Sequence, residues 1–207
     1  MAPLALPPFS VTNIQTMTVS RHTPPPSALM AISTALSLIG WGLAALRHYL
    51  LQSNAYDLGL FDQWSWLMGT GSNPVSSMEH VHVLGDHGAW VFSLAGLLYS
   101  IHPSVQWLLA SQAFVLAFTA ISVWMLATQA KLSSKKRWFC CLIWWMQPLV
   151  FNVNLFDFHP EVWAMPLLGL AIWCQRQQRW WTWITLLILI LGCRDGLVLI
   201  TLGLALS

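Results

Sequence analysis

The sequence predicts an all-α fold: a polytopic transmembrane helix bundle with interfacial helices in a large first extracytoplasmic loop. Of the 207 residues, 57% are hydrophobic and only 8% are charged, whereas about 25% of residues are charged in an average soluble domain. Long apolar runs recur along the chain. Fourteen Trp cluster near the ends of these runs, where the amphipathic indole favours the membrane-water boundary. A soluble globular domain is therefore excluded.

The charge balance excludes nucleic acid as a partner. Nine Lys and Arg oppose seven Asp and Glu, with a net charge of +2, and a nucleic-acid surface needs a cation for each phosphate contact. The four cysteines show no metal-ligand spacing, so we expect them to be small apolar core residues.

The chain divides into a tail and a membrane domain. Residues 1–27 are rich in Pro, Ser and Thr and have no long apolar run, which predicts a disordered N-terminal tail. Residues 28–207 are predicted to form a transmembrane domain. Its first span covers residues 27–46, close to the roughly 20 residues that cross a hydrocarbon core.

The segment 47–103 is too polar to lie in lipid. Within it, apolar residues recur at helical spacing from Leu58 to Met68, which predicts a short amphipathic helix on the membrane surface. Residues 89–101 are apolar but span only about 20 Å as a helix. They are predicted to form an interfacial or re-entrant helix that ends at His102-Pro103, because proline lacks the helical donor.

Four further runs complete the predicted bundle. The second span covers residues 105–128 and leads into the basic loop 131–137, which the excess of Lys and Arg predicts to be cytoplasmic. The third span covers residues 138–153, with a kink expected at Pro148. Residues 161–174 and 180–193 are predicted to be short fourth and fifth spans. The last run, 197–207, stops in mid-membrane, so we expect the N-terminal part of a longer domain or a truncated chain.

This arrangement sorts the charges by side. All seven acids are predicted to be extracytoplasmic, and only Arg47 and Arg194 accompany them. The other seven cations are predicted to be cytoplasmic, including Arg21 in the tail. A carboxylate near a membrane is costly without a partner, so we expect the acids to line a polar cleft. The alternative is that they only solvate the outer loops.

Two carboxylates on the surface helix are candidate catalytic residues. Asp57 and Asp62 are presented by one short helix beside the membrane, where they can bind a divalent cation or act as general base on a hydroxyl. The alternative for Asp57 is a helix cap. Trp64 and Trp66 are candidates for stacking on a sugar, although interfacial anchoring is the commoner role of such residues.

Two other motifs combine imidazole and carboxylate groups. On an extended strand His80 and His82 would point the same way, and with Asp86 or His87 they have the groups to ligate zinc; a solvated loop is the alternative.

In the second of these motifs, Asp157, His159 and Glu161 stand together between two predicted spans, where we expect one carboxylate to cap a helix. A fourth candidate is Arg194, which interrupts an apolar run. It has the planar donors to hold a phosphate, or it pairs locally with Asp195.

Three motifs carry a family resemblance. They are Tyr56-Asp57-Leu58-Gly59-Leu60-Phe61-Asp62-Gln63, Leu84-Gly85-Asp86-His87 and Asn154-Leu155-Phe156-Asp157-Phe158-His159-Pro160. In this order they resemble the signature of domain of unknown function 2079, a family of prokaryotic polytopic membrane proteins. The chain departs from that pattern at Gly88 and at Arg194-Asp195-Gly196, where the family has Arg-Glu-Asp.

The family is similar in layout to the GT-C glycosyltransferases. This resemblance implies transfer of a sugar from a polyprenyl-phosphate donor at the extracytoplasmic face of a bacterial inner membrane, with membrane lipid as a partner and a divalent metal as a possible cofactor. In this scheme Asp57 or Asp62 is the base, and the substrate-binding residues are Arg194, Asp86, His87, Asp157, His159 and Trp64. The alternatives are a non-catalytic transporter or binding protein, and an inactive fragment.

Overall fold

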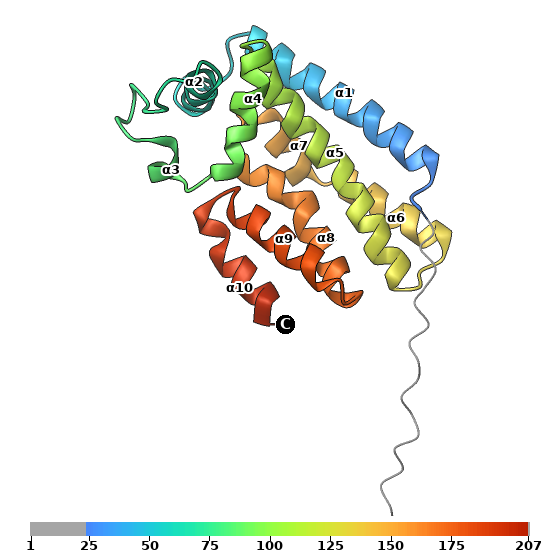
Figure 1. Cartoon of the computed structure of the whole chain (residues 1–207). Helices are drawn as coiled ribbons and strands as arrows, with labels where there is room; N and C mark the ends of the chain where they lie inside the picture. The colour runs from blue at the N-terminus through green and yellow to red at the C-terminus, as the bar shows by residue number, and fades with distance from the viewer. Residues whose placement is uncertain (1–23, 207) are drawn as a thin grey trace, which may run out of the picture.

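The computed structural model describes residues 24–206, which form an all-α bundle (Figure 1). The predicted tail, with Arg21, lies mostly outside the described residues. The helices in chain order are α1 Ser27–Tyr49, α2 Asp57–Gly69, α3 Val83–Asp86, η1 Trp90–Phe92, α4 Ser93–Ile101, α5 Gln106–Gln129, α6 Ser134–Trp145, α7 Pro148–Leu155, η2 Pro160–Trp163, α8 Ala164–Arg176, α9 Trp180–Leu191, η3 Asp195–Leu197 and α10 Val198–Leu206.

The first two predicted spans are confirmed as helices that can cross a membrane. Helices α1 and α5 have 23 and 24 residues and are apolar enough to do so; at 1.5 Å per residue each is about 35 Å long, enough for a hydrocarbon core of about 30 Å. They pack against each other along the bundle (Figure 1). Helix α1 begins directly after Pro26 and extends three residues beyond the predicted end at residue 46.

The third predicted span is divided between two helices. Helices α6 and α7 meet at a bend of 43°, and together they are long and apolar enough for one crossing. Pro148 occupies the first turn of α7, where its missing N–H leaves no helical bond unmade. The predicted kink is thus confirmed, and α6 begins at Ser134, four residues before the predicted start of the span.

The fourth and fifth predicted spans are helical but short. Helix α8 has 13 residues and α9 has 12, so each falls below the roughly 20 residues of a full crossing. Within residues 24–206, two helices are long and apolar enough to cross a membrane, and α6 and α7 add a third crossing if they form one span. The crossing of α8 and α9 stays a prediction.

The segment before α5 folds beside one end of the bundle. The predicted surface helix is confirmed as α2, which packs against α4; its position on a membrane surface stays a prediction. The predicted helix over residues 89–101 starts as the 3-10 turn η1 and continues as α4, which ends before His102-Pro103. The buried side chains beneath this segment include Phe61, Trp64 and Phe92.

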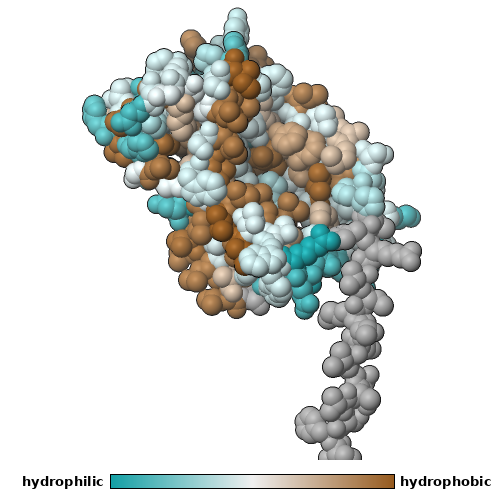
Figure 2. All heavy atoms as spheres, in the orientation of Figure 1, coloured by the Kyte–Doolittle hydropathy of each residue, from teal (hydrophilic) through white to brown (hydrophobic). Residues whose placement is uncertain are grey.

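The two ends of the bundle differ in charge. The end where α1 finishes, α5 begins and α9 finishes carries all seven acids, whereas the basic residues of the α5–α6 and α8–α9 connections lie at the opposite end (Figure 1). Figure 2 shows hydrophilic side chains over α2 and α3 and again near the α8–α9 turn, with apolar surface between them. The sorting of charge by end is therefore a property of the fold.

Candidate functional site

A part-buried ion pair joins α1 to the connection between α7 and η2. Asp157 is 1% exposed, and its Oδ1 accepts a hydrogen bond from Arg47 Nη1 at 2.8 Å. Its Oδ2 accepts a second bond from the backbone N–H of Asn54 at 2.6 Å. Each oxygen of this carboxylate is thus paired, as a buried charge requires.

Asn54 connects the Asp157 carboxylate to the start of α2. Its side-chain oxygen accepts the backbone N–H of Tyr56 at 2.9 Å, and its amide donates to Oδ2 of Asp57 at 3.0 Å. Asp57 does not cap α2: the residue at the cap position is Tyr56, and no side-chain cap bond forms there. The capping interpretation of Asp57 is therefore wrong, because the Asn54 amide engages its carboxylate.

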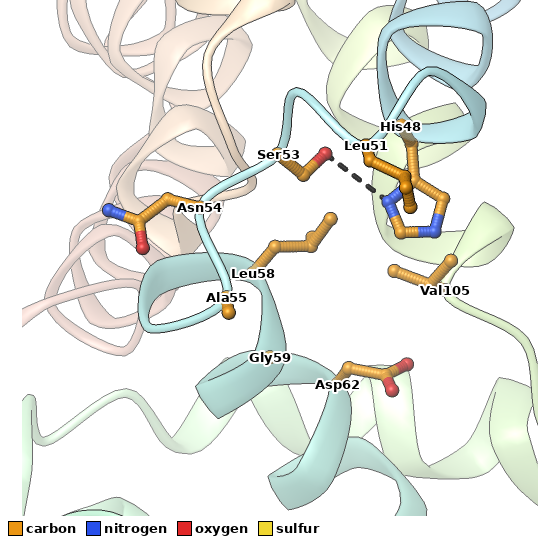
Figure 3. A pocket seen from close by; sticks show the side chains of 9 residues that line it. All are labelled: His48, Leu51, Ser53, Asn54, Ala55, Leu58, Gly59, Asp62 and Val105. Carbon is orange, nitrogen blue, oxygen red and sulfur yellow. Dashed lines mark hydrogen bonds between the residues drawn. The ribbon is translucent and has the colours of Figure 1, made fainter.

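Asp62, in contrast, faces a cavity of about 310 Å³ between the ends of α1, α2 and α5 (Figure 3). The apolar part of its wall comes from Leu51, Ala55, Leu58, Gly59 and Val105. The polar part comes from His48, Ser53, Asn54 and Asp62, and His48 Nδ1 lies 3.2 Å from Ser53 Oγ. Of the two candidate bases, Asp62 lines this cavity and Asp57 does not.

Tyr99 holds the Asp62 carboxylate from the side of α4. Its hydroxyl donates to Asp62 Oδ1 at 2.6 Å. Burial raises the pKa of Tyr99, and the hydrogen bond to Asp62 raises it further, so the hydroxyl keeps its proton. Since Oδ1 is engaged, Oδ2 is the oxygen available to a ligand.

The contact between Tyr99 and Asp62 depends on two glycines that let α2 and α4 approach. A Cβ at Gly96 would lie 2.5 Å from Met68 Cβ, and one at Gly69 would lie 2.8 Å from Tyr99 Cβ. Neither position has room for a side chain, because both partners are the inflexible first atoms of their side chains.

Gly96→Ala is accordingly expected to destabilise the protein by about 1–3 kcal/mol through overpacking. The matched control is Gly42→Ala in α1, where an added Cβ meets nothing within 4 Å and helix propensity predicts a gain of up to about 1 kcal/mol. Unfolding in detergent micelles measures both. Equal stability of the two variants would contradict the close approach of α2 and α4.

A second group of charged residues lies around His87. Its Nδ1 contacts Oδ2 of Asp86, and its backbone oxygen accepts the N–H of Asp195 at 2.9 Å. Arg194 pairs with Glu161. Burial lowers the pKa of His87 and the Arg194 guanidinium lowers it further, against the opposing carboxylates of Glu161 and Asp195.

The aromatic ring of Phe61 joins this second group to the Asp157 segment. Its centroid lies 5.9 Å from that of His87 and 5.6 Å from that of His159. His159 Nδ1 in turn lies 2.9 Å from the backbone oxygen of Asp157. Phe61 directly precedes Asp62 on α2, so the ring that contacts both imidazoles is next in the chain to the carboxylate that lines the cavity.

Several local expectations are wrong. Arg194 pairs with Glu161 rather than with its neighbour Asp195. His80 has a left-handed φ of 57° and so does not share an extended strand with His82, which forms an isolated bridge with Val75. Within residues 24–206, no three His, Cys, Asp or Glu side chains gather as a metal site would require.

The structure also differs from two further expectations. They are the capping of a helix by Asp157 or Glu161 and the stacking of Trp64 on a sugar. His159, not an acid, precedes η2 at the cap position, without a side-chain cap bond, because the two carboxylates bind Arg47 and Arg194. Trp64 is 0% exposed and has no open face for a sugar. Trp66 on the same helix is 48% exposed.

Three side chains of the candidate site were not predicted from the sequence. Tyr99 and His48 stand in apolar runs with no motif around them. Arg47 had a usable signal, because it is one of two cations among the acids and a buried carboxylate needs a cation.

Comparisons with known proteins place the chain in a family. Residues 47–207 match the sequence profile of a family described as "Predicted membrane protein (DUF2079)". No curated protein matches the chain. No solved structure matches it either.

Proposed function

We propose a function for this chain, which belongs to the DUF2079 family of predicted membrane proteins. The proposed function is that of a membrane glycosyltransferase. In this proposal the protein transfers a sugar from a polyprenyl-phosphate donor to an acceptor hydroxyl. The reaction takes place at the extracytoplasmic face of the bacterial inner membrane, where the acidic end of the bundle lies.

The placement of Asp62 carries the proposal. Its carboxylate lines a cavity at the ends of two membrane-spanning helices, and Tyr99 fixes its orientation. A general base must reach the proton that it removes. With Asp62 Oδ1 held by Tyr99, Oδ2 takes the proton of the acceptor hydroxyl while the hydroxyl oxygen forms a bond to C1 of the sugar. The bond from C1 to the phosphate oxygen breaks with inversion, and polyprenyl phosphate leaves with the electron pair.

Arg194 is the candidate to hold the departing phosphate. It lies in the group around His87, beyond the Phe61 ring, and its side chain is 37% exposed, so ligand can reach it. Charge that develops on the leaving oxygen is stabilised by a preorganised cation. Binding requires Arg194 to share or exchange its contact with Glu161. We assign Asp86, His87, Asp157 and His159 to shaping the substrate site.

Turnover by the full-length protein tests this function. In vesicles of bacterial lipid, the wild-type protein is expected to release polyprenyl phosphate from a polyprenyl-phosphate sugar only when an acceptor alcohol is present. Mass spectrometry of the lipid fraction measures donor, product and leaving group. Intact donor across the common polyprenyl-phosphate hexoses and pentoses would remove the proposal.

The break between α6 and α7 favours a second candidate, a transporter. Broken helices form the binding sites of many secondary transporters, and these two helices meet at a 43° bend. A transporter moves its substrate chemically unchanged. Uptake of radiolabelled sugar into sealed vesicles without formation of a new glycosidic bond would favour this candidate over the transferase.

A further inference from the structure

The Asp62 cavity lies where two membrane spans end. His48 belongs to the last turn of α1, and Val105 directly precedes α5. The ends of spanning helices lie near the boundary between hydrocarbon and water. The cavity therefore opens at the depth of the bilayer surface, where one end of a bound molecule can stay in lipid.

The chain at the end of α1, which leads to Leu51 in the cavity wall, is apolar and exposed. Tyr49, Leu50 and Leu51, which follow each other at the end of α1, are 82%, 54% and 92% exposed. Leu51 also has a left-handed φ of 58°, a conformation that costs a residue other than glycine about 1–2 kcal/mol and persists where the surrounding structure imposes it. Because Leu51 lines the cavity and is 92% exposed, its apolar side chain stands at the mouth of the cavity.

The charge inside the cavity selects against anions. Asp62 contributes a carboxylate to the wall, and Arg and Lys are absent from the described residues that line the cavity. A phosphate placed here would meet a like charge in a partly apolar site, where repulsion is stronger than in water. The cavity therefore does not suit the phosphate of the donor, whereas a neutral hydroxyl can donate to Asp62.

We propose that this cavity is the acceptor subsite and that the acceptor is a neutral amphiphile, with a hydroxyl-bearing head at Asp62 and an apolar tail in the bilayer. The assignment rests on the proposed transferase function and separates the two substrates. The acceptor occupies the Asp62 cavity, and the anionic donor is held outside it.

Protection of a cysteine reporter tests the assignment without turnover. Ala55 lines the cavity and is exposed, so Ala55→Cys in the full chain, in phosphatidylcholine nanodiscs, reports occupancy by its rate of maleimide labelling. Asn73→Cys, exposed in the loop after α2, is the matched control. The probes are decyl glucoside, decyl phosphate and decyltrimethylammonium, and the unmodified chain gives the background from native cysteines.

Decyl glucoside at twice its Kd is expected to slow labelling at position 55 by about threefold by mass action, with no change at position 73. Decyl phosphate is expected to have no effect until Asp62→Asn removes the repulsion, after which it slows labelling as well. No protection by decyl glucoside would overturn the assignment. So would equal protection by decyl phosphate with Asp62 intact, or stronger protection by decyltrimethylammonium that Asp62→Asn abolishes.

The two proposals fail separately. Protection by decyl glucoside without any donor consumption would support a binding site for a neutral amphiphile. It would contradict the transferase function and therefore the acceptor role of the cavity. Donor consumption without protection leaves the transferase and removes the acceptor subsite from this cavity.

Discussion

Asp62→Asn is expected to slow sugar transfer by roughly 100- to 10,000-fold, the usual contribution of a positioned general base. The amide keeps the shape of the carboxylate and can still accept the Tyr99 hydrogen bond, so the fold is expected to be unchanged. It has no basic oxygen to take the proton of the acceptor. The initial rate of polyprenyl-phosphate release measures the loss.

Asp57→Asn is the matched control for this variant. Asp57 lies on the same helix, but its carboxylate is engaged by the Asn54 amide and does not line the cavity. Its replacement is expected to cost less than about tenfold, well below the effect of losing a general base. A loss at Asp57 equal to or greater than that at Asp62 would transfer the role of base to Asp57 and contradict the assignment.

Asp157→Ala is expected to destabilise the protein by about 1–3 kcal/mol, the usual cost of leaving hydrogen-bonding groups without their partner, because the Arg47 side chain is 25% exposed. The substitution leaves the Arg47 guanidinium and the Asn54 N–H without their acceptor. The loop that forms one wall of the cavity then loses its anchor. The free energy of unfolding in mixed micelles measures the effect.

Asp195→Ala provides the comparison for this stability measurement. Asp195 is exposed and bonds locally to the backbone of Gly196, so its loss is expected to change the free energy of unfolding by less than about 1 kcal/mol, as is usual for surface positions. If Asp157→Ala were no worse than Asp195→Ala, the ion pair between Arg47 and Asp157 would not anchor the loop.

The long apolar helices and the gathering of acids at one end could be predicted from sequence. Apolar length locates α1 and α5, and Pro148 marks the break between α6 and α7. Alternating passage of helices through the bundle then brings sequence-distant loops to the same end. These features depend on local composition and chain direction, which the sequence displays directly.

The pairing of side chains could not be predicted in the same way. Arg47 binds Asp157, 110 positions away, and Arg194 prefers Glu161 to its neighbour Asp195. These choices depend on how helices pack. The same holds for Asp57 and Asp62, because only the close approach of α4 at Gly69 and Gly96 gives one of them a tyrosine partner.

Trp64 shows a similar limit. Its place on an apolar stripe with Leu58 and Phe61 is equally compatible with lipid contact, sugar contact and core burial. The structure buries it because α4 and the Phe158 segment cover that face of α2. The sequence pattern identifies the apolar face, and tertiary packing decides what the face contacts.

The location of the acidic end outside the cytoplasm is the claim on which the proposed chemistry depends, and the sidedness of two loops tests it most directly. In intact cells, a membrane-impermeant maleimide is predicted to label Asn73→Cys at the acidic end. It is predicted to label Ser133→Cys, exposed in the α5–α6 connection, only after the membrane is permeabilised. Labelling of both positions in intact cells, or of Ser133→Cys alone, would contradict the account.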